Sequence, residues 1–345
     1  MIFHAFGIHN RAVWNALQLH AHLLSQSGEQ IVFLVHEKHQ QIVQHSFPEY
    51  PILTYRGYVD FLKMIIASDQ KSIFTSTFTD TLRSIPALLF KKLRIYYWVQ
   101  GIEAEESYMR NGSRIRKQII SILEKISLYF STYQILVSPY MKTYLEAKHH
   151  SHLDNSIIIP CTSDLHYNGS PKIKDSFTYV GGMAVWQRFD VMLDMFNHIA
   201  QERPNAHFYV ATGGIEHAKS LIATHLHSDY HNRISIRSID SRSEMEEFLS
   251  TIEYGFLIRD DDPVNNVSSP IKLAEYLSCG VNVIISDVVT SYAPMVESYG
   301  AGIRIHGSND IKQMRMISCS PKNALDMYND HFDAESLVEK YRSIL

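Results

Sequence analysis

Short apolar runs alternate with longer amphipathic segments along most of the chain, and this pattern predicts the fold class. In the first half, the runs rich in β-branched and aromatic residues, which we predict as strands, are residues 1–6, 30–36, 72–77, 94–100 and 133–138. Residues 11–28 show helical spacing and end at Gly28, which predicts a helix. Strands that alternate with helices of this length favour βαβ units and a parallel sheet.

The alternation restarts after a polar segment with two prolines at residues 157–175, which we interpret as an interdomain linker. The strands predicted beyond it are residues 176–182, 207–214, 233–239, 254–259 and 281–287, and the last predicted helix is residues 333–345. A chain of 345 residues is long enough for two domains. We therefore predict an α/β protein with two Rossmann-like, doubly wound domains that face each other across a cleft.

The composition and net charge of the chain limit the classes of function that it can have. With 45% hydrophobic and 20% charged residues the chain has a globular composition, and its net charge of −4 gives no sign of nucleic-acid binding. The cysteines are Cys161, Cys279 and Cys319, and their scatter and odd number favour a reducing compartment. The first ten residues lack the features of a signal peptide, and no apolar run approaches the roughly 18 residues of a spanning helix. We expect a cytoplasmic protein.

In open α/β sheets, ligands bind at loops that follow the carboxyl ends of strands, and one such loop leads into a short predicted helix. Ser269 suits the N-cap and Pro270 the first helical position, and the helix should end at the next glycine. Its first amides form an anion site, Lys272 adds a cation, and Glu275 lies one turn further on the same face. These features fit the diphosphate and ribose of a nucleotide. A capped surface helix with a Lys–Glu pair fits them equally well.

Two neighbouring loops carry residues of the same kind. Arg259 ends the strand at residues 254–259 and supplies a second cation for phosphate. Gly181 and Gly182 follow an earlier strand and would let a ligand approach the backbone, with Trp186 placed to stack. A glycine pair is equally typical of a plain turn.

The segments FTYVGGMAVWQRFDVMLDMF, IRSID, RDDDPVNNVSSPIKLAEYLSCGVNVIISD and YGAGI follow one another in the second half, with IIIPCTSD before them and WVQGIEAEESY in the first half. In this order they resemble the signatures of GT-B glycosyltransferases, and most closely those of family 4, the retaining enzymes of bacterial surface-polysaccharide assembly. The resemblance covers most of the chain and is strongest over residues 157–305. It implies an acceptor-binding domain at 1–165, a nucleotide-sugar-binding domain at 166–330, and a helix at 331–345 that packs back on the first domain.

The resemblance also implies a set of donor-site residues. The residues are Gly181, Gly182, Gln187, Ser238, Ile239, Arg259, Ser268, Ser269, Lys272 and Glu275. Glu275 is assigned to the ribose, and the backbone at Ser238 and Ile239 to the base. Neutralisation of the diphosphate then falls to Arg259, Lys272 and the amides at the start of the helix.

The chain departs from the family pattern at two places. Val267 stands where the family usually has an acid that contacts the donor sugar, and Gly182 and Gln187 stand where it has a basic pair. These departures favour one alternative, a catalytically silent sugar-nucleotide-binding or glycan-binding partner of an assembly complex. An isomerase of the UDP-sugar 2-epimerase kind, which shares the fold, is the other alternative.

In the first domain the resemblance implies acceptor contacts and a polar residue near the sugar. The candidates are Gln100, Glu103, Glu105 and Glu106, which follow the strand at 94–100. A helix start that carries acids to complement its dipole fits these residues as well. Gly7, in the first strand-to-helix loop, would clear space at the cleft floor, and a plain turn fits it equally.

No metal and no cofactor are expected, because the nucleotide-sugar is a substrate. The run Asp260, Asp261 and Asp262 is similar to the metal-binding motif of GT-A glycosyltransferases, but it precedes a helix start instead of lying in a single nucleotide domain near the start of the chain. The histidines of HLHSDYH and HHSH lack the helical pair and acid of a hydrolytic zinc site.

Residues 109–130 combine five basic residues with Ile, Leu and Tyr. A basic amphipathic helix of this kind lies on anionic lipid or packs on the core with a solvated basic side, and the sequence leaves both open. The expectation is a metal-independent glycosyltransferase that moves a sugar from a nucleotide-sugar, UDP-linked, to a glycan or lipid-linked acceptor with retention of configuration. We expect it in the cytoplasm, including at the inner face of the cytoplasmic membrane.

Overall fold

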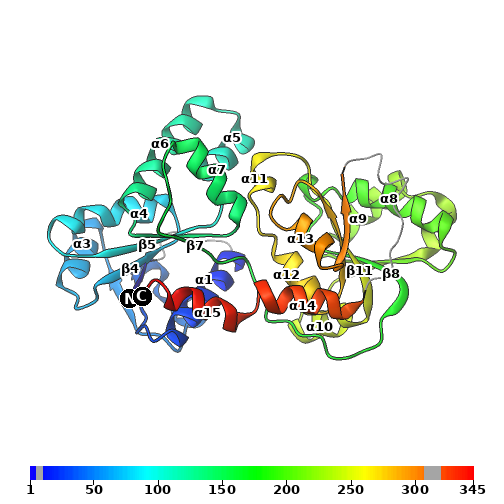
Figure 1. The fold of residues 1–345 in the computed structure, drawn as a ribbon, viewed down its shortest axis with the longest axis horizontal. Helices are drawn as coiled ribbons and strands as arrows, with labels where there is room; N and C mark the ends of the chain where they lie inside the picture. The colour runs from blue at the N-terminus through cyan, green and yellow to red at the C-terminus, as the bar shows by residue number, and fades with distance from the viewer. Residues whose placement is uncertain (5–10, 307–319) are drawn as a thin grey trace. The chain divides into compact units, whose positions relative to one another are not determined.

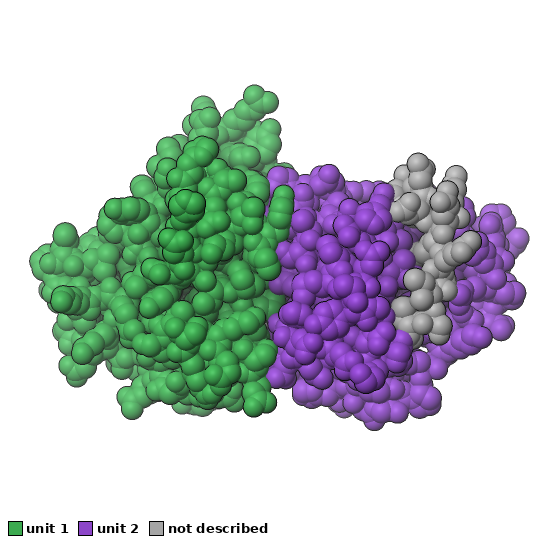
Figure 2. Space-filling model, viewed as in Figure 1, with its two compact units in different colours: residues 1–160, 334–345 green, residues 161–333 purple. Residues whose placement is uncertain are grey.

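The computed structural model describes residues 1–4, 11–306 and 320–345, and the chain forms two compact units. Unit 1 contains Met1–Pro160 together with Ala334–Leu345, and unit 2 contains Cys161–Asp333. Figure 2 colours the two units separately. Gly7 lies outside the described residues.

Unit 1 is built on a seven-stranded sheet in the order β3-β2-β1-β4-β5-β6-β7, and all neighbouring strands are parallel. The strands are β1 (Ile2–His4), β2 (Val32–His36), β3 (Ile52–Tyr55), β4 (Ser72–Thr75), β5 (Arg94–Val99), β6 (Tyr133–Leu136) and β7 (Ser156–Ile158). This order is that of a Rossmann fold, in which the direction of winding reverses between β1 and β4.

The helices of unit 1 connect these strands. They are α1 (Arg11–Gln26), η1 (Glu37–His39), α2 (Gln40–Ser46), α3 (Tyr58–Ala67), α4 (Phe78–Ser84), η2 (Ile85–Leu89), α5 (Glu103–Asn111), α6 (Arg114–Phe130), α7 (Pro139–His149) and α15 (Ala334–Arg342). The terminal helix α15 lies beside α1 (Figure 1). Its fully buried Tyr341 hydrogen-bonds with buried His20 of α1 through the phenol oxygen and Nδ1.

Unit 2 repeats this architecture with a six-stranded parallel sheet in the order β10-β9-β8-β11-β12-β13. Its strands are β8 (Ile173–Val180), β9 (His207–Ala211), β10 (Ile234–Arg237), β11 (Ile252–Leu257), β12 (Asn282–Ser286) and β13 (Gly302–Ile305). Its helices are η3 (Val185–Gln187), α8 (Phe189–Glu202), α9 (Ile215–His225), η4 (Ser228–Arg233), α10 (Arg242–Thr251), α11 (Pro263–Asn266), α12 (Ile271–Ser278), α13 (Ala293–Ser298) and α14 (Pro321–His331).

Each face of the second sheet has its own apolar core. Along β12, Val283 and Ile285 belong to one buried cluster and Ile284 to the other, because successive side chains of a strand point to opposite faces. A strand covered on both faces needs a continuous apolar run, which explains why these strands are unbroken apolar runs in the sequence. The prediction of two Rossmann-like α/β domains is confirmed.

The structure corrects the predicted helix at residues 109–130. Gly112 adopts φ 65° and ends α5, and the Ser113 side chain accepts a hydrogen bond from the Arg116 amide to cap α6. A left-handed glycine followed by a serine cap is a strong stop-and-start signal. The structure also contains strands β3, β7 and β13, which the sequence pattern did not indicate. All three are edge strands that are only partly buried. Across the described ranges, every helix is too short or too polar to span a bilayer.

Candidate functional site

The predicted donor-site residues of unit 2 gather around the carboxyl ends of β8 and β11. These two strands are neighbours at the point where the strand order reverses, and such switch points are the usual ligand sites of open α/β sheets. Gly181 follows β8, Arg259 follows β11, and Lys272 lies in the first turn of α12. The Arg259 amide donates to Ser286 Oγ at 2.8 Å, which fixes this loop to the end of β12.

Gln187, the last residue of η3, joins the two cations. Its Oε1 accepts hydrogen bonds from Arg259 Nη1 at 2.7 Å and from Lys272 Nζ. Arg259 Nη1 also donates to the Trp186 carbonyl at 3.2 Å. Two cations therefore converge on a single neutral oxygen, in the arrangement that proteins use to hold the oxygens of a phosphate.

The ammonium group of Lys272 lies in a largely buried position. The residue is 9% exposed, and its Nζ lies 4.5 Å from the ring centroid of Tyr179 and donates to the Tyr179 hydroxyl at 3.3 Å. Burial, and next the positive charge of Arg259, lower the pKa of Lys272 to about 7. A bound anion would favour the charged form of this side chain and raise that pKa.

Gly181 makes room for Lys272. A Cβ at this position would lie 2.7 Å from both Cε and Nζ of Lys272 and 3.1 Å from the Tyr179 hydroxyl. Gly181 also adopts φ 143°, which side chains rarely tolerate. By contrast, a Cβ at Gly182 would meet no atom within 4 Å. In this structure the first glycine is needed for the close approach of a lysine.

Helix α12 begins one residue later than predicted, with Pro270 instead of Ser269 as its N-cap. The Ser269 hydroxyl accepts a hydrogen bond from the Cys161 amide at 3.0 Å. The Ser268 hydroxyl donates to the Asn265 carbonyl at 2.7 Å. The prediction of a Ser269 cap is therefore wrong, because a partner distant in sequence occupies its side chain.

Tyr276 anchors α12 to the sheet. Its hydroxyl accepts a hydrogen bond from the Val180 amide at 3.1 Å, directly before Gly181. Its ring packs against Gly255 of β11 so closely that a Cβ there would lie 2.7 Å from two ring carbons. The helix that carries Lys272 is thereby fixed against both strands of the switch point.

Glu275 lies on the next turn of α12 with a carboxylate that is largely shielded from solvent. Burial raises its pKa, and the charges of Arg242 and Lys272 act in the opposite direction. No hydrogen bond to this carboxylate forms among residues 1–4, 11–306 and 320–345. A carboxylate that is shielded from water and has no hydrogen-bond donor is suited to accept a hydrogen bond from a ligand hydroxyl.

The two residues predicted to face the base follow β10, the edge strand of the sheet. Ser238 is exposed and its hydroxyl donates to Asp240 at 3.0 Å, while Ile239 packs partly against the core. The next helix, α10, starts with Arg242, the residue whose charge lowers the pKa of Glu275. This relation places the start of α10 near the Glu275 carboxylate.

Unit 1 uses two of its four predicted polar residues to tie neighbouring loops together. The side-chain amide of Gln100 donates to the Ser76 carbonyl at 2.8 Å. Glu103 accepts a hydrogen bond from the Phe78 amide at 3.2 Å, at the first residue of α4. Burial raises the pKa of Glu103 to about 7 despite this hydrogen bond. Both residues lie at the carboxyl ends of β4 and β5.

The other two acids differ in their surroundings. Glu105 is 4% exposed and pairs with Lys148 at 2.8 Å and with Lys117 at 3.5 Å. Burial acts to raise its pKa, but the hydrogen bond and charge of Lys148, with a hydrogen bond from Tyr144, lower it overall. Glu106 has a raised pKa because of burial, with Arg110 acting against it. Glu105 thus belongs to an ion-pair network between helices, whereas Glu106 forms no ion pair with any residue that the structure describes.

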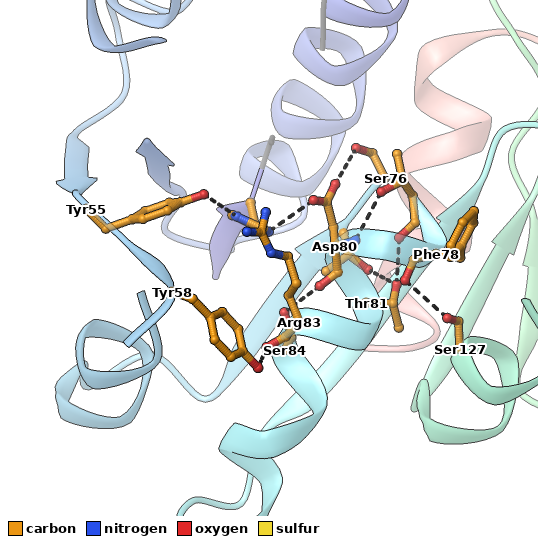
Figure 3. A network of polar contacts seen from close by, with 12 residues as sticks. Tyr55, Tyr58, Ser76, Phe78, Asp80, Thr81, Arg83, Ser84 and Ser127 are labelled. Carbon is orange, nitrogen blue, oxygen red and sulfur yellow. Dashed lines mark hydrogen bonds and ion pairs between the residues drawn. The ribbon is translucent and has the colours of Figure 1, made fainter. Parts of the chain in front are cut away.

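A second polar cluster lies at the switch point of unit 1 and was not predicted from the sequence (Figure 3). His4, at the end of β1, contacts the Tyr55 hydroxyl through Nε2 at 3.1 Å and Asp80 through Nδ1 at 3.5 Å. Thr77 caps α4 by accepting from the Asp80 amide at 3.1 Å. His4 and Asp80 are both fully buried.

Burial keeps both partners of this cluster neutral at neutral pH. It lowers the pKa of His4 to about 3 and raises the pKa of Asp80 to about 8. The residues of this cluster come from three separate segments of the chain. In the sequence, its only sign is a histidine and an aspartate near the ends of apolar stretches.

The acidic run after β11 does not form a carboxylate cluster. Asp260 pairs with Arg188, and Asp262 caps α11 by accepting from the Asn265 amide at 2.9 Å. Asp261 accepts from the Asn266 side chain at 3.1 Å. In the part of the chain that the structure describes, no group of three or more His, Cys, Asp or Glu residues is arranged to hold a metal ion.

Comparison with solved structures identifies the fold. HepE of Anabaena, in complex with UDP, matches with a TM-score of 0.71 at 11% identity over 99% of this chain and 98% of that chain. Sucrose-phosphate synthase of Thermosynechococcus elongatus matches with a TM-score of 0.68 at 12% identity over 100% and 98%. The lipopolysaccharide outer core galactosyltransferase WaaB matches with a TM-score of 0.68 at 11% identity over 100% of both chains.

No protein-family model and no curated protein sequence matches the chain. At 10 to 12% identity, structural likeness of this extent shows the fold. The order of strands in both units agrees with it. The chain has the GT-B glycosyltransferase fold.

Proposed function

We propose that this protein is a glycosyltransferase that moves a hexosyl group from a UDP-sugar to a glycan or lipid-linked acceptor, with retention of configuration. The observation that carries the proposal is the convergence of Arg259 and Lys272 on one oxygen at the switch point of unit 2. The fold supports it, and so do the ligands of HepE, which was solved with UDP and with UDP-glucose.

The donor is proposed to bind with its diphosphate at the two cations and its ribose at Glu275. A carboxylate on the next turn of the helix is placed to accept hydrogen bonds from ribose hydroxyls, and Glu275 has no donor of its own among the described residues. The loop at Ser238 and Ile239 is proposed to contact the base, since the helix that follows it starts near Glu275.

The chemistry proposed for this site is stabilisation of a leaving group. As the bond from the sugar to the diphosphate breaks, negative charge grows on the phosphate oxygens, and fixed cations nearby stabilise it. Arg259 and Lys272 would supply this charge, so we propose that the reaction needs no metal. We propose retention of configuration because of the family resemblance. In that family, the acceptor attacks the sugar on the face that the diphosphate leaves.

Unit 1 is proposed to bind the acceptor and to bring a titratable group to the sugar. Glu103 fits this role best, because its pKa of about 7 lies in the range where a carboxyl group exchanges protons at neutral pH. Gln100 and Glu106 stay candidates, and Glu105 is the weakest because it is held by two lysines. We propose that the pathway is bacterial cell-surface polysaccharide synthesis, as for the outer core enzyme WaaB.

Helix α6 is proposed to contact an anionic membrane. Its exposed large apolar side chains are Ile115, Ile119, Ile122, Ile126, Tyr129 and Phe130. They recur at spacings of three and four and form one stripe, which we call the α6 face. The exposed ionic residues of α6 are Arg114, Arg116 and Lys125. An apolar stripe with only basic residues around it fits a surface of anionic lipid.

The experiment that tests the function is titration of UDP into the protein by calorimetry, followed by assay of UDP release from UDP-glucose, UDP-galactose and UDP-N-acetylglucosamine with and without a chelator. We expect UDP binding and slow release from at least one donor in the presence of chelator. Glu275→Gln should weaken UDP binding about 10- to 100-fold, because a hydrogen bond to a charged group contributes about 1.5–3 kcal/mol.

Glu247→Gln is the matched control, because Glu247 is an exposed acid on the neighbouring helix α10. Its affinity for UDP should equal that of the wild type. Unchanged affinity of the Glu275 variant would contradict the ribose assignment, and absence of UDP binding by the wild type would contradict the function. Binding without turnover would favour the silent binding partner, and conversion of one UDP-sugar into another would favour the isomerase.

A further inference from the structure

The oxygen between Arg259 and Lys272 belongs to an amide, and this is unusual for a pair of cations so close together. Gln187 Oε1 is the shared acceptor of Arg259 Nη1 and Lys272 Nζ. Neither cation forms an ion pair with a carboxylate within the described residues. The hydrogen-bond acceptors of the two cations are therefore neutral oxygens, and the Gln187 oxygen is the one that they share.

We infer that the Gln187 side chain is a clasp that holds the place of a donor phosphate oxygen in the free protein and leaves Arg259 and Lys272 when a diphosphate binds. The ligand class is a nucleoside diphosphate or its pyrophosphate part. This inference rests on the proposed function, because it concerns the same site. It adds a residue that sets the affinity of that site from within the chain.

The segment that carries Gln187 is suited to such a movement. It is the short helix η3, whose Val185 and Trp186 side chains are 83% and 60% exposed, so they contribute little packing. Arg188, the next residue, adopts φ 51° and pairs with Asp190 and Asp260, which fixes the far end of the segment. The amide can therefore rotate about its side-chain bonds while the backbone stays in place.

The exchange of partners is favourable on electrostatic grounds. A phosphate oxygen carries negative charge and attracts both cations directly, whereas the neutral amide oxygen offers them only its dipole. The clasp also stabilises the free protein, because it gives the largely buried ammonium group of Lys272 a second acceptor beside the Tyr179 hydroxyl. As the pKa of Lys272 is about 7 in the free protein, binding of the anion should also take up a proton at pH 8.

The test uses two variants of nearly equal side-chain size. Gln187→Met removes the competing oxygen, and we expect it to bind UDP and inorganic pyrophosphate about tenfold more tightly, from the loss of competing hydrogen bonds to charged groups. Gln187→Glu places a carboxylate between the cations, and we expect at least about tenfold weaker binding of both ligands. The matched control is Gln201→Glu, which adds the same charge at an exposed position of α8, and its affinity should be unchanged.

Thermal unfolding of each variant separates an effect on binding from loss of the fold. If Gln187→Met fails to fold, Gln187→Ala serves for the same measurement. Equal or weaker binding by a folded Met or Ala variant overturns the clasp, and so do shifts of the same sign in the Met and Glu variants.

The two ligands distinguish this inference from the proposed function. If the wild type binds UDP but the variants show no opposed shifts, the clasp is wrong and the function is unaffected. If pyrophosphate follows the expected pattern while UDP binds no better than pyrophosphate, the clasp stands and the nucleotide assignment falls. If the wild type binds neither ligand, both fall.

Discussion

Gly181→Ala is the substitution that most directly tests how unit 2 builds its proposed anion site. The new Cβ would lie 2.7 Å from Cε and Nζ of Lys272, so the two cannot keep their positions. Because those atoms are the end of a flexible side chain, the lysine should move and the fold should persist. The substitution therefore removes Lys272 from the site without changing its chemistry.

Two magnitudes follow from this geometry. An alanine held at φ 143° is strained, and strain of this kind costs about 1–3 kcal/mol of folding free energy. Loss of the charged hydrogen bond that Lys272 offers to a phosphate costs about 1.5–3 kcal/mol of binding free energy, which is roughly a 10- to 100-fold higher Kd for UDP. Gly57→Ala in unit 1 is the control, because its Cβ would also meet nothing within 4 Å and Gly57 is not among the predicted donor-site residues.

The assay combines calorimetric titration of UDP with guanidinium unfolding for Gly181→Ala, Lys272→Met and the double variant. If Gly181 acts through Lys272, the alanine should change UDP affinity by no more than about twofold in the Lys272→Met background, because the two substitutions remove one interaction. Full additivity of the two losses would refute this account, and so would an unchanged Kd for Gly181→Ala alone.

Two further predictions concern unit 1. The pKa of Asp80 is raised to about 8 in the folded protein, so its contribution to stability is complete below its ordinary pKa of 3.8 and is lost as pH rises through 8. From pH 6.5 to 8, where His4 is neutral in the folded protein, we expect the free energy of unfolding of the wild type in urea to fall by about 2 kcal/mol relative to that of Asp80→Asn. The same pH dependence of the unfolding free energy in both proteins would contradict this. For the α6 face, the double substitution Ile119→Ser and Ile122→Ser should lower sedimentation with phosphatidylserine vesicles at least about tenfold without lowering the unfolding midpoint, since both side chains are more than half exposed; equal partitioning would show that α6 does not contact lipid.

The fold was predictable because its determinants are local and repeat along the chain. Each central strand is an apolar run that the packing of helices on both faces requires, as in β12, where neighbouring residues serve opposite cores. Strands β3, β7 and β13 were missed because they are partly buried edge strands, so their packing does not require the apolar run that marks a central strand. Gly112 and Ser113 indicate in the sequence that α5 ends and α6 begins between them. The prediction missed this helix end because the apolar repeat continues on both sides of it.

The candidate site was predictable as a set of residues and less so as an arrangement. A strand end followed by a cation, or a helix start with a lysine, is visible in the sequence, and Arg259, Lys272 and Gly181 do come together. Which oxygen atom they share depends on contacts between residues that are far apart in the sequence. Ser269 shows the same limit, since its hydroxyl is taken by an amide far away in the chain.

The same limit explains Gln187. In the sequence, Gln187 only marks the absence of a basic residue that the family usually has. That absence by itself suggests a site with weaker affinity for phosphate. In the structure the amide oxygen lies between the two remaining cations, so the substitution changes what the free site contains as well as its charge. A site with fewer cations and an internal acceptor should bind phosphate with lower affinity but keep Lys272 ordered between turnovers. The departure from the family pattern is therefore compatible with an active enzyme whose donor affinity is set by its own chain.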